Sequence, residues 1–336
     1  MASVVGSPMS ARDKVLVTGA GGFIGSHLTE AIVRTGADVV ALVRYNSRNE
    51  WGNLEDLDAE ILRSVKVVTG DVRDPQFVRT VIKGRTLVFH LAALIAVPYS
   101  FFSPSSYVST NVEGTLNILQ ASMDLGVERV VHTSTSEVYG TAIYVPIDEE
   151  HPLQAQSPYA ASKIAADKLV ESFHHSSSLP VVTVRPFNNF GPRQSARAII
   201  PTIATQAMSA GSVRLGKLSP VRDFLFVTDT VRGFLLAAKA PGVLGRVMNL
   251  STGTGVSIAE LTEKIFKLLG VRSEVVADPE RVRPGTSEVE KLVGSSVRSR
   301  ELLGWAPQVT LGDGLLQTLE WLRIHSARYK REIYNV

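Results

Sequence analysis

Residues 14–25, Lys14-Val15-Leu16-Val17-Thr18-Gly19-Ala20-Gly21-Gly22-Phe23-Ile24-Gly25, form the stretch that decides the fold. The first five residues are an apolar run that predicts a buried strand, and a helical pattern follows over 26–34. Between them, Gly19, Gly22 and Gly25 are spaced for a tight turn, a close approach of a pyrophosphate to the backbone, and close packing of helix on sheet. Free N–H groups at the helix start favour an anion. The stretch therefore predicts a dinucleotide-binding turn, with a purely structural glycine-rich turn as the alternative.

The alternation of strand and helix continues along the chain. Further apolar runs predict buried strands at 38–43, 65–69, 87–90, 129–132 and 181–184. Helical patterns cover 107–125, 256–269 and 311–334. Strands that alternate with helices favour a parallel sheet covered on both faces, so we expect an α/β protein with a Rossmann-type doubly wound parallel sheet. Beyond Pro186 the loops lengthen and arginines appear singly, which indicates a smaller C-terminal α/β substrate-binding domain.

Composition narrows the classes of function. The chain has 336 residues, 44% of them hydrophobic, which is enough for a large core. A formal net charge of +3 is small for this length, so nucleic acid is not expected as a partner. The absence of cysteine excludes disulfides and thiolate metal sites and fits a cytoplasmic protein, and no metal is expected. The longest apolar run, 87–97, is too short to span a bilayer, so no membrane partner is expected.

A second constellation joins 133–140, Thr133-Ser134-Thr135-Ser136-Glu137-Val138-Tyr139-Gly140, with 157–163, Ser157-Pro158-Tyr159-Ala160-Ala161-Ser162-Lys163. The first segment follows the predicted strand at 129–132, so its polar groups emerge where open α/β sheets bind ligands. In the second segment, Ser157 and Pro158 suit the start of a helix. That start places Tyr159 and Lys163 four residues apart on one helix face.

These side chains offer acid–base chemistry. A neighbouring ammonium favours phenolate, so we expect Lys163 to lower the pKa of Tyr159 and make it a base near neutral pH. A Ser or Thr hydroxyl of the 133–135 group is placed to hydrogen-bond the same substrate oxygen, and Glu137 supplies a separate proton acceptor. A simple surface pair of Tyr159 and Lys163 is the alternative.

The end of the second predicted strand bears on the choice of cofactor. An NAD site usually has an acidic residue there for the ribose 2′-hydroxyl. This chain has Arg44-Tyr45-Asn46-Ser47-Arg48 instead, and two guanidiniums suit a 2′-phosphate. We therefore favour NADP over NAD, with two solvated surface arginines as the alternative.

From about Lys14 to its C-terminus, the chain resembles the extended short-chain dehydrogenase/reductase family, the nucleotide-sugar epimerases and dehydratases. Thr18-Gly19-x-x-Gly22-x-x-Gly25 resembles the family's cofactor loop, and Tyr159-x-x-x-Lys163 its catalytic pair. The segment at 185–192, Arg185-Pro186-Phe187-Asn188-Asn189-Phe190-Gly191-Pro192, resembles its sugar-nucleotide segment. The resemblance implies a tightly bound NADP or NAD and a homodimer formed through a four-helix interface that includes 107–125.

The resemblance, with the patterns above, assigns site residues. The cofactor-binding set is Gly19, Gly22, Phe23, Ile24, Gly25, Arg44, Asn46, Ser47, Arg48, Asp71, Val72, Leu91, Ala92, Ala93, Tyr159 and Lys163. The catalytic set is Thr135, Ser136, Glu137, Tyr159 and Lys163. The substrate-binding set is Asn188, Arg193, Arg222 and Arg283, because guanidinium forks match the oxygens of a diphosphate.

The expected division has a leader and two domains. Residues 1–13 are small and polar and predict a flexible leader. Residues 14–185 and about 224–252 are expected to form the dinucleotide-binding domain, with 222–229 as a strand that returns into it. Residues at about 186–223 and 253–336 are expected to form the sugar-nucleotide-binding domain.

The order Thr135-Ser136-Glu137 bears on the reaction. It resembles the 4,6-dehydratases, in which a C4 ketone acidifies C5, a glutamate removes the C5 proton and the C6 hydroxyl leaves as water. Many relatives carry Asp where this chain has Ser136, so Glu137 is expected to deliver the proton as well. Residues 44–54, 188–201 and 332–336 resemble N-acetylglucosamine-nucleotide 4,6-dehydratases of nonulosonic-acid pathways, which implies a UDP- or GDP-linked substrate. UDP-glucuronate decarboxylase, nucleotide-sugar 4-epimerase and a non-catalytic dinucleotide sensor are the alternatives.

Overall fold

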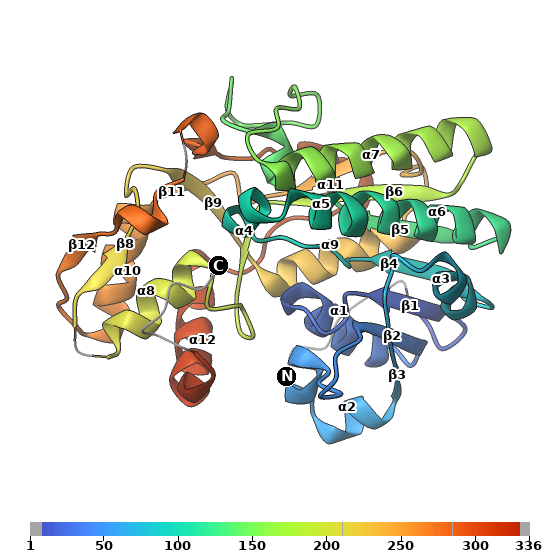
Figure 1. Cartoon of the computed structure of the whole chain (residues 1–336), viewed down its shortest axis with the longest axis horizontal. Coiled ribbons are helices and arrows are strands. Elements are labelled where there is room, and N and C mark those ends of the chain that lie inside the picture. Colours follow the sequence, from blue (N-terminus) through green and yellow to red (C-terminus); the bar gives the residue numbers. More distant parts are fainter. Residues whose placement is uncertain (1–8, 210, 284, 330–336) are drawn as a thin grey trace.

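The core of the molecule is a parallel sheet, seen in the computed structural model, which describes residues 9–209, 211–283 and 285–329 (Figure 1). Its seven strands lie in the order β10-β6-β5-β4-β1-β2-β3, and all neighbouring pairs are parallel. They are β1 (Lys14–Thr18), β2 (Asp38–Arg44), β3 (Val65–Gly70), β4 (Leu87–His90), β5 (Arg129–Thr133), β6 (Val181–Pro186) and β10 (Val247–Leu250). The chain runs outward from β1 to β3 and then returns to β4. The predicted doubly wound parallel sheet is confirmed, and its strand order reverses between β1 and β4, where such sheets bind ligands.

Helices cover both faces of this sheet, because its strands are apolar on both sides. Val15 and Val17 of β1 pack with Leu28 and Phe234 in one core cluster, while Leu16 between them packs in another cluster on the opposite face. The first face carries α1 (Phe23–Val33), α9 (Val227–Lys239) and α11 (Val297–Leu303). The opposite face carries α3 (Pro75–Ile82), α6 (Gly114–Asp124) and α7 (Pro158–Ser177). The short helices α2 (Ala59–Arg63), α4 (Val97–Phe102) and α5 (Pro104–Tyr107) lie in connections.

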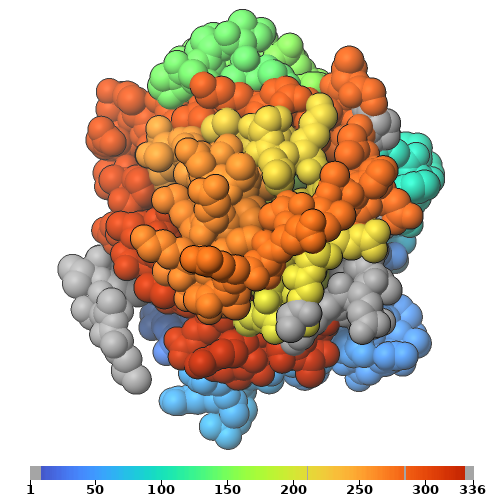
Figure 2. All heavy atoms as spheres, turned by 90° about the vertical axis from the view of Figure 1, so that its left-hand side faces the viewer, coloured from blue at the N-terminus to red at the C-terminus, as the bar shows by residue number. Residues whose placement is uncertain are grey.

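A second group of elements lies beside the carboxyl ends of the sheet, on the left in Figure 1. Its strands are β7 (Asn188–Phe190), β8 (Val213–Leu215), β9 (Val221–Phe226), β11 (Gly255–Ser257), β12 (Val275–Ala277) and β13 (Lys291–Leu292). Its helices, α8 (Ile199–Ala207), α10 (Ile258–Leu269) and α12 (Leu311–Ile324), pack on β9 and on each other around a separate apolar cluster. Segments far apart in sequence thus form one continuous face, shown in yellow, orange and red in Figure 2.

Strand β9 corrects one expectation. The strand predicted at 222–229 is shorter, since residues 227–229 already belong to α9, and it does not return into the seven-stranded sheet. It pairs with β7, β11 and β13 instead. The chain rejoins the large sheet only through α9 and β10. Phe224 and Phe226 of β9 belong to the second apolar cluster, and their mutual partner Phe190 explains why the strand stays there.

The ends of three other predicted segments differ from expectation. The helix at 107–125 begins earlier, with α5, and passes through a π-helical turn, Val108–Glu113, before α6. Helix α12 ends at Ile324, so the predicted helix is wrong over 325–329, where a 3-10 turn, Ser326–Arg328, follows. Residues 330–336 lie outside the described residues. Residues 1–8 of the predicted leader also lie outside them, whereas Met9 is buried and Asp13 is ion-paired with Lys239.

The described residues lack two kinds of feature. None of the helices is long and apolar enough to cross a membrane. No group of three or more His, Asp or Glu side chains is gathered so that it could hold a metal ion.

Candidate active site

The turn between β1 and α1 has the geometry that its glycines predict. Gly19 has a φ of +69°, and a Cβ there would lie 2.8 Å from the backbone N of Ala92. A Cβ on Gly25 would lie 2.2 Å from the carbonyl oxygen of Gly19. Gly22 is the N-cap of α1 and no side chain caps this helix. The helix N-terminus is thus open to an anion, although binding itself stays a prediction.

A single cavity of about 1260 Å³ lies at the carboxyl ends of β1, β2 and β4, between the large sheet and the second group of elements. Most of the predicted site residues line it. The cofactor group contributes Gly19, Gly22, Phe23, Ile24, Gly25, Arg44, Asn46, Asp71, Val72, Leu91, Ala92 and Ala93. The catalytic group contributes Thr135, Ser136, Glu137, Tyr159 and Lys163, and the substrate group Asn188, Arg222 and Arg283. Residues separated by more than 250 positions in the chain therefore face one space.

Three predicted residues do not line the cavity. Ser47 and Arg48 are exposed in the loop after β2, and Arg48 pairs with Glu50 at 3.6 Å. The Asn46 side chain holds this loop, because its amide donates to the carbonyl of Glu50 and its oxygen accepts from two backbone N–H groups. Arg44 is therefore the one basic residue of this segment that lines the cavity, among the described residues.

Arg193 is the third. Its guanidinium donates to Glu30 of α1 at 2.8 Å and is largely buried. Burial of neighbouring His27, together with the positive charge of Arg193, lowers the pKa of His27 to about 4. In this structure Arg193 therefore attaches the segment after β7 to α1, rather than facing the substrate space.

Helix α7 begins as predicted and brings the predicted catalytic pair into the interior. The Ser157 hydroxyl accepts from the backbone N–H of Ala160, and Pro158 occupies the first turn. Tyr159 and Lys163 are both buried. The Lys163 ammonium donates to the carbonyl oxygen of Thr133 at 2.7 Å, at the end of β5. A surface pair is thereby excluded.

The expected lowering of the pKa of Tyr159 by Lys163 is wrong for the protein without ligands. Burial raises the pKa of Tyr159, the hydrogen bond with Thr135 opposes this increase, and the charge of Glu137 adds to it. Burial also lowers the pKa of Lys163 to about 8, against the opposing charge of Asp167. Desolvation is therefore the largest cause of the pKa shift of both Tyr159 and Lys163. The spacing of the two residues in the sequence could not reveal their burial.

Charged side chains of the predicted substrate-binding residues lie close to Glu137. Arg283 lies 3.5 Å from the Glu137 carboxylate, and buried Arg222 lies 3.3 Å from Glu288. All four side chains line the cavity. Glu288 was not predicted, although two arginines buried in one site require a nearby counter-charge. Two lining atoms, Asn188 Oδ1 and Thr133 Oγ1, are buried without a hydrogen-bond partner among the described residues.

A buried ion pair supports the catalytic segment from behind. Asp167 accepts from Arg185 at 2.9 Å, from the Ser134 hydroxyl at 2.7 Å and from His132 at 3.1 Å. Burial alone would raise the pKa of Asp167, but the hydrogen bond from His132 and the charge of Arg185 lower it well below its usual range. Arg185 also donates to the Tyr139 hydroxyl at 2.9 Å.

Comparisons with known proteins agree with this geometry. The family described as GDP-mannose 4,6-dehydratase matches residues 16–318. This chain belongs to the extended short-chain dehydrogenase/reductase family of nucleotide-sugar epimerases and dehydratases. The family resemblance inferred from the glycine turn, the Tyr159–Lys163 pair and the segment at 185–192 is thus confirmed.

Individual members of this family align over nearly the whole chain. A dTDP-glucose 4,6-dehydratase of Streptomyces niveus is 35% identical over 94% of this chain and 94% of its own length. A UDP-glucose 4-epimerase of Mycolicibacterium smegmatis is 34% identical over 92% of this chain and 98% of its own. The crystal structure of DesIV, a dTDP-glucose 4,6-dehydratase from Streptomyces venezuelae with NAD bound, matches with a TM-score of 0.85. That comparison has 32% identity and covers 94% of this chain and 98% of DesIV.

Proposed function

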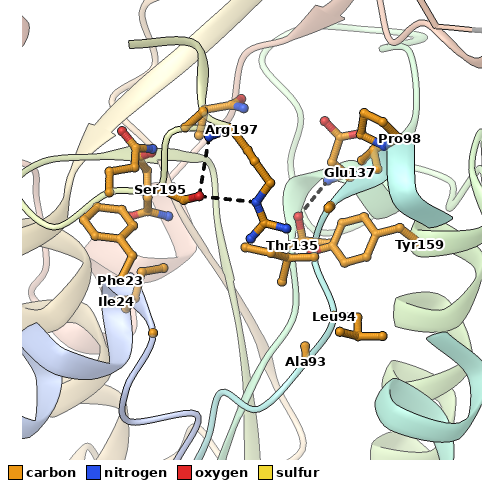
Figure 3. Close-up of a pocket in the computed structure, with 18 of the residues that line it drawn as sticks. Phe23, Ile24, Ala93, Leu94, Pro98, Thr135, Glu137, Tyr159, Ser195 and Arg197 are labelled. Carbon is orange, nitrogen blue, oxygen red and sulfur yellow. Dashed lines mark hydrogen bonds between the residues drawn. The ribbon is translucent and has the colours of Figure 1, made fainter. Parts of the chain in front are cut away.

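We propose that this protein is a nucleotide-sugar 4,6-dehydratase that depends on NAD(P) and acts on a nucleotide-linked hexose, with UDP- or GDP-N-acetylhexosamine as the favoured substrate. The observation that carries the proposal is the placement of Thr135, Glu137 and Tyr159 in one cavity (Figure 3). The glycine turn lines the same cavity. The dehydratases among its relatives support the reaction class. The N-acetylhexosamine rests on the resemblance alone.

The cavity suits a dinucleotide. Gly19 and Gly22 leave room for a pyrophosphate at the open N-terminus of α1, and Leu91, Ala92 and Ala93 form a wall of small and apolar groups. The bound dinucleotide would supply reversible hydride transfer, from C4 of the sugar and back to C6, and its oxidised ring a positive charge that favours phenolate. That charge would counter the effect of burial on the pKa of Tyr159.

Two side chains act on the C4 oxygen of the sugar. Tyr159 accepts the proton of the C4 hydroxyl, and the Thr135 hydroxyl donates a hydrogen bond to the same oxygen. Lys163, held on the carbonyl of Thr133, keeps a positive charge behind the phenol. The C4 carbonyl that results makes the C5 proton acidic.

Glu137 performs the elimination. Its carboxylate removes the C5 proton, the electron pair moves to form the C5–C6 double bond, and the C6 hydroxyl leaves as water with the proton from Glu137. Return of hydride to C6 would place the electron pair on C5 beside the C4 carbonyl, and a proton from solvent would then restore the C5–H bond. Glu137 carries both proton transfers because Ser136 stands where many relatives have an acid. The ion pair with Arg283 holds the carboxylate in the cavity.

The preference for NADP rests on Arg44, which lies at the end of β2 and lines the cavity. We expect Arg44→Ala to weaken binding of NADP by roughly tenfold and that of NAD hardly at all. Titration of both cofactors by fluorescence measures this, and equal losses would favour NAD.

We also propose a homodimer, a cytoplasmic location, and two domains. The dinucleotide-binding domain takes 14–185 with 227–252, because β9 pairs outside the large sheet. The sugar-nucleotide-binding domain takes the remaining residues from 186 onward.

Incubation of the purified protein with NAD or NADP and a panel of dTDP-, UDP- and GDP-linked hexoses and N-acetylhexosamines tests the function. Mass spectrometry should find a product lighter by one water. An unchanged mass with inverted C4 would indicate an epimerase, and loss of carbon dioxide from UDP-glucuronate a decarboxylase. No turnover of any nucleotide sugar would favour a dinucleotide sensor.

A further inference from the structure

The arginines that line the cavity differ in how their charges are balanced. Arg222 is paired with Glu288, and Arg283 with Glu137. Arg197 also lines the cavity, but no carboxylate among the described residues forms an ion pair with it. Its side chain is held only through Nε, which donates to the Ser195 hydroxyl at 3.3 Å. The terminal nitrogens of Arg197 are therefore available to a ligand.

The backbone that carries Arg197 is fixed. The N–H of Ala198 donates to the carbonyl of Ser195 at 3.0 Å, which closes a turn around Arg197. The Thr202 hydroxyl, in the first turn of α8, donates to the carbonyl of Ala196 at 3.0 Å. Such a turn fixes the backbone from which the exposed Arg197 side chain extends, which reduces the ordering that binding requires.

That direction is toward the reacting groups. In Figure 3 the Arg197 side chain extends from its loop into the middle of the cavity, toward Thr135 and Tyr159, while Ser195 lies nearer to Phe23 and Ile24. Burial raises the pKa of Tyr107 to about 12, and the charge of Arg197 opposes this increase. The Tyr107 ring packs edge-on against Tyr159, with centroids 6.2 Å apart. The guanidinium and the catalytic phenol thus share one part of the cavity.

We propose that Arg197 binds the glycosyl phosphate half of the substrate and contributes to its specificity, an inference that rests on the proposed function. The groups that must reach C4, C5 and C6 are Thr135, Tyr159 and Glu137, so a donor beside them faces the sugar rather than the base. A carboxylate at C6 is not its ligand, because dehydration requires a hydroxyl there. The guanidinium donates its N–H groups to an acceptor oxygen, either of an acyl group on the sugar or of the phosphate at C1.

Binding measurements on Arg197→Met test this assignment. The probes are UDP-N-acetylglucosamine, UDP-glucose, UDP and UMP, or the guanosine or thymidine series if the wild-type protein binds it more tightly. We expect Arg197→Met to weaken UDP-N-acetylglucosamine by roughly 10- to 100-fold, as for a lost charged hydrogen bond, and UMP by less than about twofold. A loss confined to the N-acetylated sugar identifies the acyl oxygen. A loss shared by UDP-glucose and UDP identifies the phosphate.

Arg272→Met serves as the matched control, because Arg272 is exposed and lies outside the cavity. It should leave every affinity unchanged. Equal weakening of UMP and UDP-N-acetylglucosamine by Arg197→Met would overturn the proposal, as would unchanged affinity for all four probes. Binding of the nucleotide sugars by the wild-type protein without loss of water would instead reject the dehydratase function, while the binding series would still decide the role of Arg197.

Discussion

At the scale of single residues, Lys163 is a buried side chain whose positive charge is disfavoured by desolvation. It is buried in α7, and its ammonium has the carbonyl of Thr133 as a hydrogen-bond partner and Asp167 as the carboxylate that favours its charge. Burial nevertheless lowers the pKa of Lys163 from its ordinary 10.5 to about 8. A charge retained at this cost indicates a role in chemistry rather than in stability.

The lowered pKa of Lys163 makes stability depend on pH. Between pH 8 and 10.5 the unfolded chain binds the proton that Lys163 of the folded protein has lost, so the contribution of Lys163 to the stability of the wild-type protein rises with pH across this window. Lys163→Met lacks this titration. The free energy of unfolding of Lys163→Met minus that of wild type should therefore be more positive at pH 7 than at pH 10.5, by up to about 3 kcal/mol. Denaturant unfolding at both pH values measures the difference. The exposed control Lys168→Met should show no such trend, and parallel curves for wild type and Lys163→Met would contradict the prediction.

The separate roles of Glu137 and Tyr159 give a second prediction. Tyr159→Phe should block oxidation at C4, because no other group accepts the hydroxyl proton. Glu137→Gln should still allow slow oxidation at C4, seen as absorbance of the reduced cofactor, but should slow the loss of water by roughly 100- to 10,000-fold. Mass spectrometry of the product measures the second step. Equal rates of dehydration in wild type and Glu137→Gln would reject the assignment of the base.

The spacing and types of the residues predicted where the candidate catalytic groups lie but not how their pKa values are shifted. Tyr159 and Lys163 could be predicted because a helix face follows from a spacing of four. The raised pKa of Tyr159 could not, because burial depends on packing by residues such as Tyr107, more than fifty positions away in sequence. For the same reason, Arg197 could not be told from Arg193 before the structure showed which guanidinium had a carboxylate partner.

At the scale of elements, the short 3-10 turn Ser136–Tyr139 carries Glu137, and the ion pair of Asp167 and Arg185 holds both sides of it. Before the turn, the Ser134 hydroxyl donates to Asp167. At its end, the Tyr139 hydroxyl accepts from Arg185 and donates to Asn249 Oδ1 at 2.8 Å. Helix α7 and strands β6 and β10 are thereby tied to the catalytic turn.

Removal of one hydroxyl should therefore affect Glu137 more than Tyr159. We expect Tyr139→Phe to slow dehydration by roughly tenfold and to destabilise the protein by about 1–3 kcal/mol, because Arg185 and Asn249 each lose a buried partner. Oxidation at C4 should change less than twofold. The control is Tyr144→Phe, whose exposed hydroxyl donates to Asp148. If C4 oxidation and dehydration fell together, the hydroxyl would be stabilising the whole site rather than positioning the turn.

Helix boundaries could be predicted where capping residues determine the start of the helix. Ser157 and Pro158 fixed the start of α7, and Ser257 with Glu260 forms a capping box at the start of α10. Strand β9 was assigned to the wrong sheet because its apolar run suits either one. Only its aromatic partners in the second cluster, above all Phe190, distinguish them.

At the scale of the whole molecule, the helical segment at 104–124 connects the cavity to the surface. On its inner side, Asn111 accepts from the backbone N–H of Leu94 and donates to its carbonyl, so it holds one wall of the cavity. On its outer side, Val108 and Leu116 are exposed at 50% and 37%. Helix α6 also packs against α7 (Figure 1), so two copies that met here would form a bundle of four helices.

The apolar residues on this outer side predict the oligomeric state. Val108→Glu combined with Leu116→Glu should convert the proposed dimer to a monomer, because carboxylates at the centre of a helical interface lose their water and repel each other across the symmetry axis. Light scattering coupled to size-exclusion chromatography should give the mass of two chains for wild type and of one for the double variant. Leu302→Glu on α11, where the leucine is 38% exposed, should remain dimeric and controls for an added surface charge. A wild-type protein of one chain at micromolar concentration would contradict the interface.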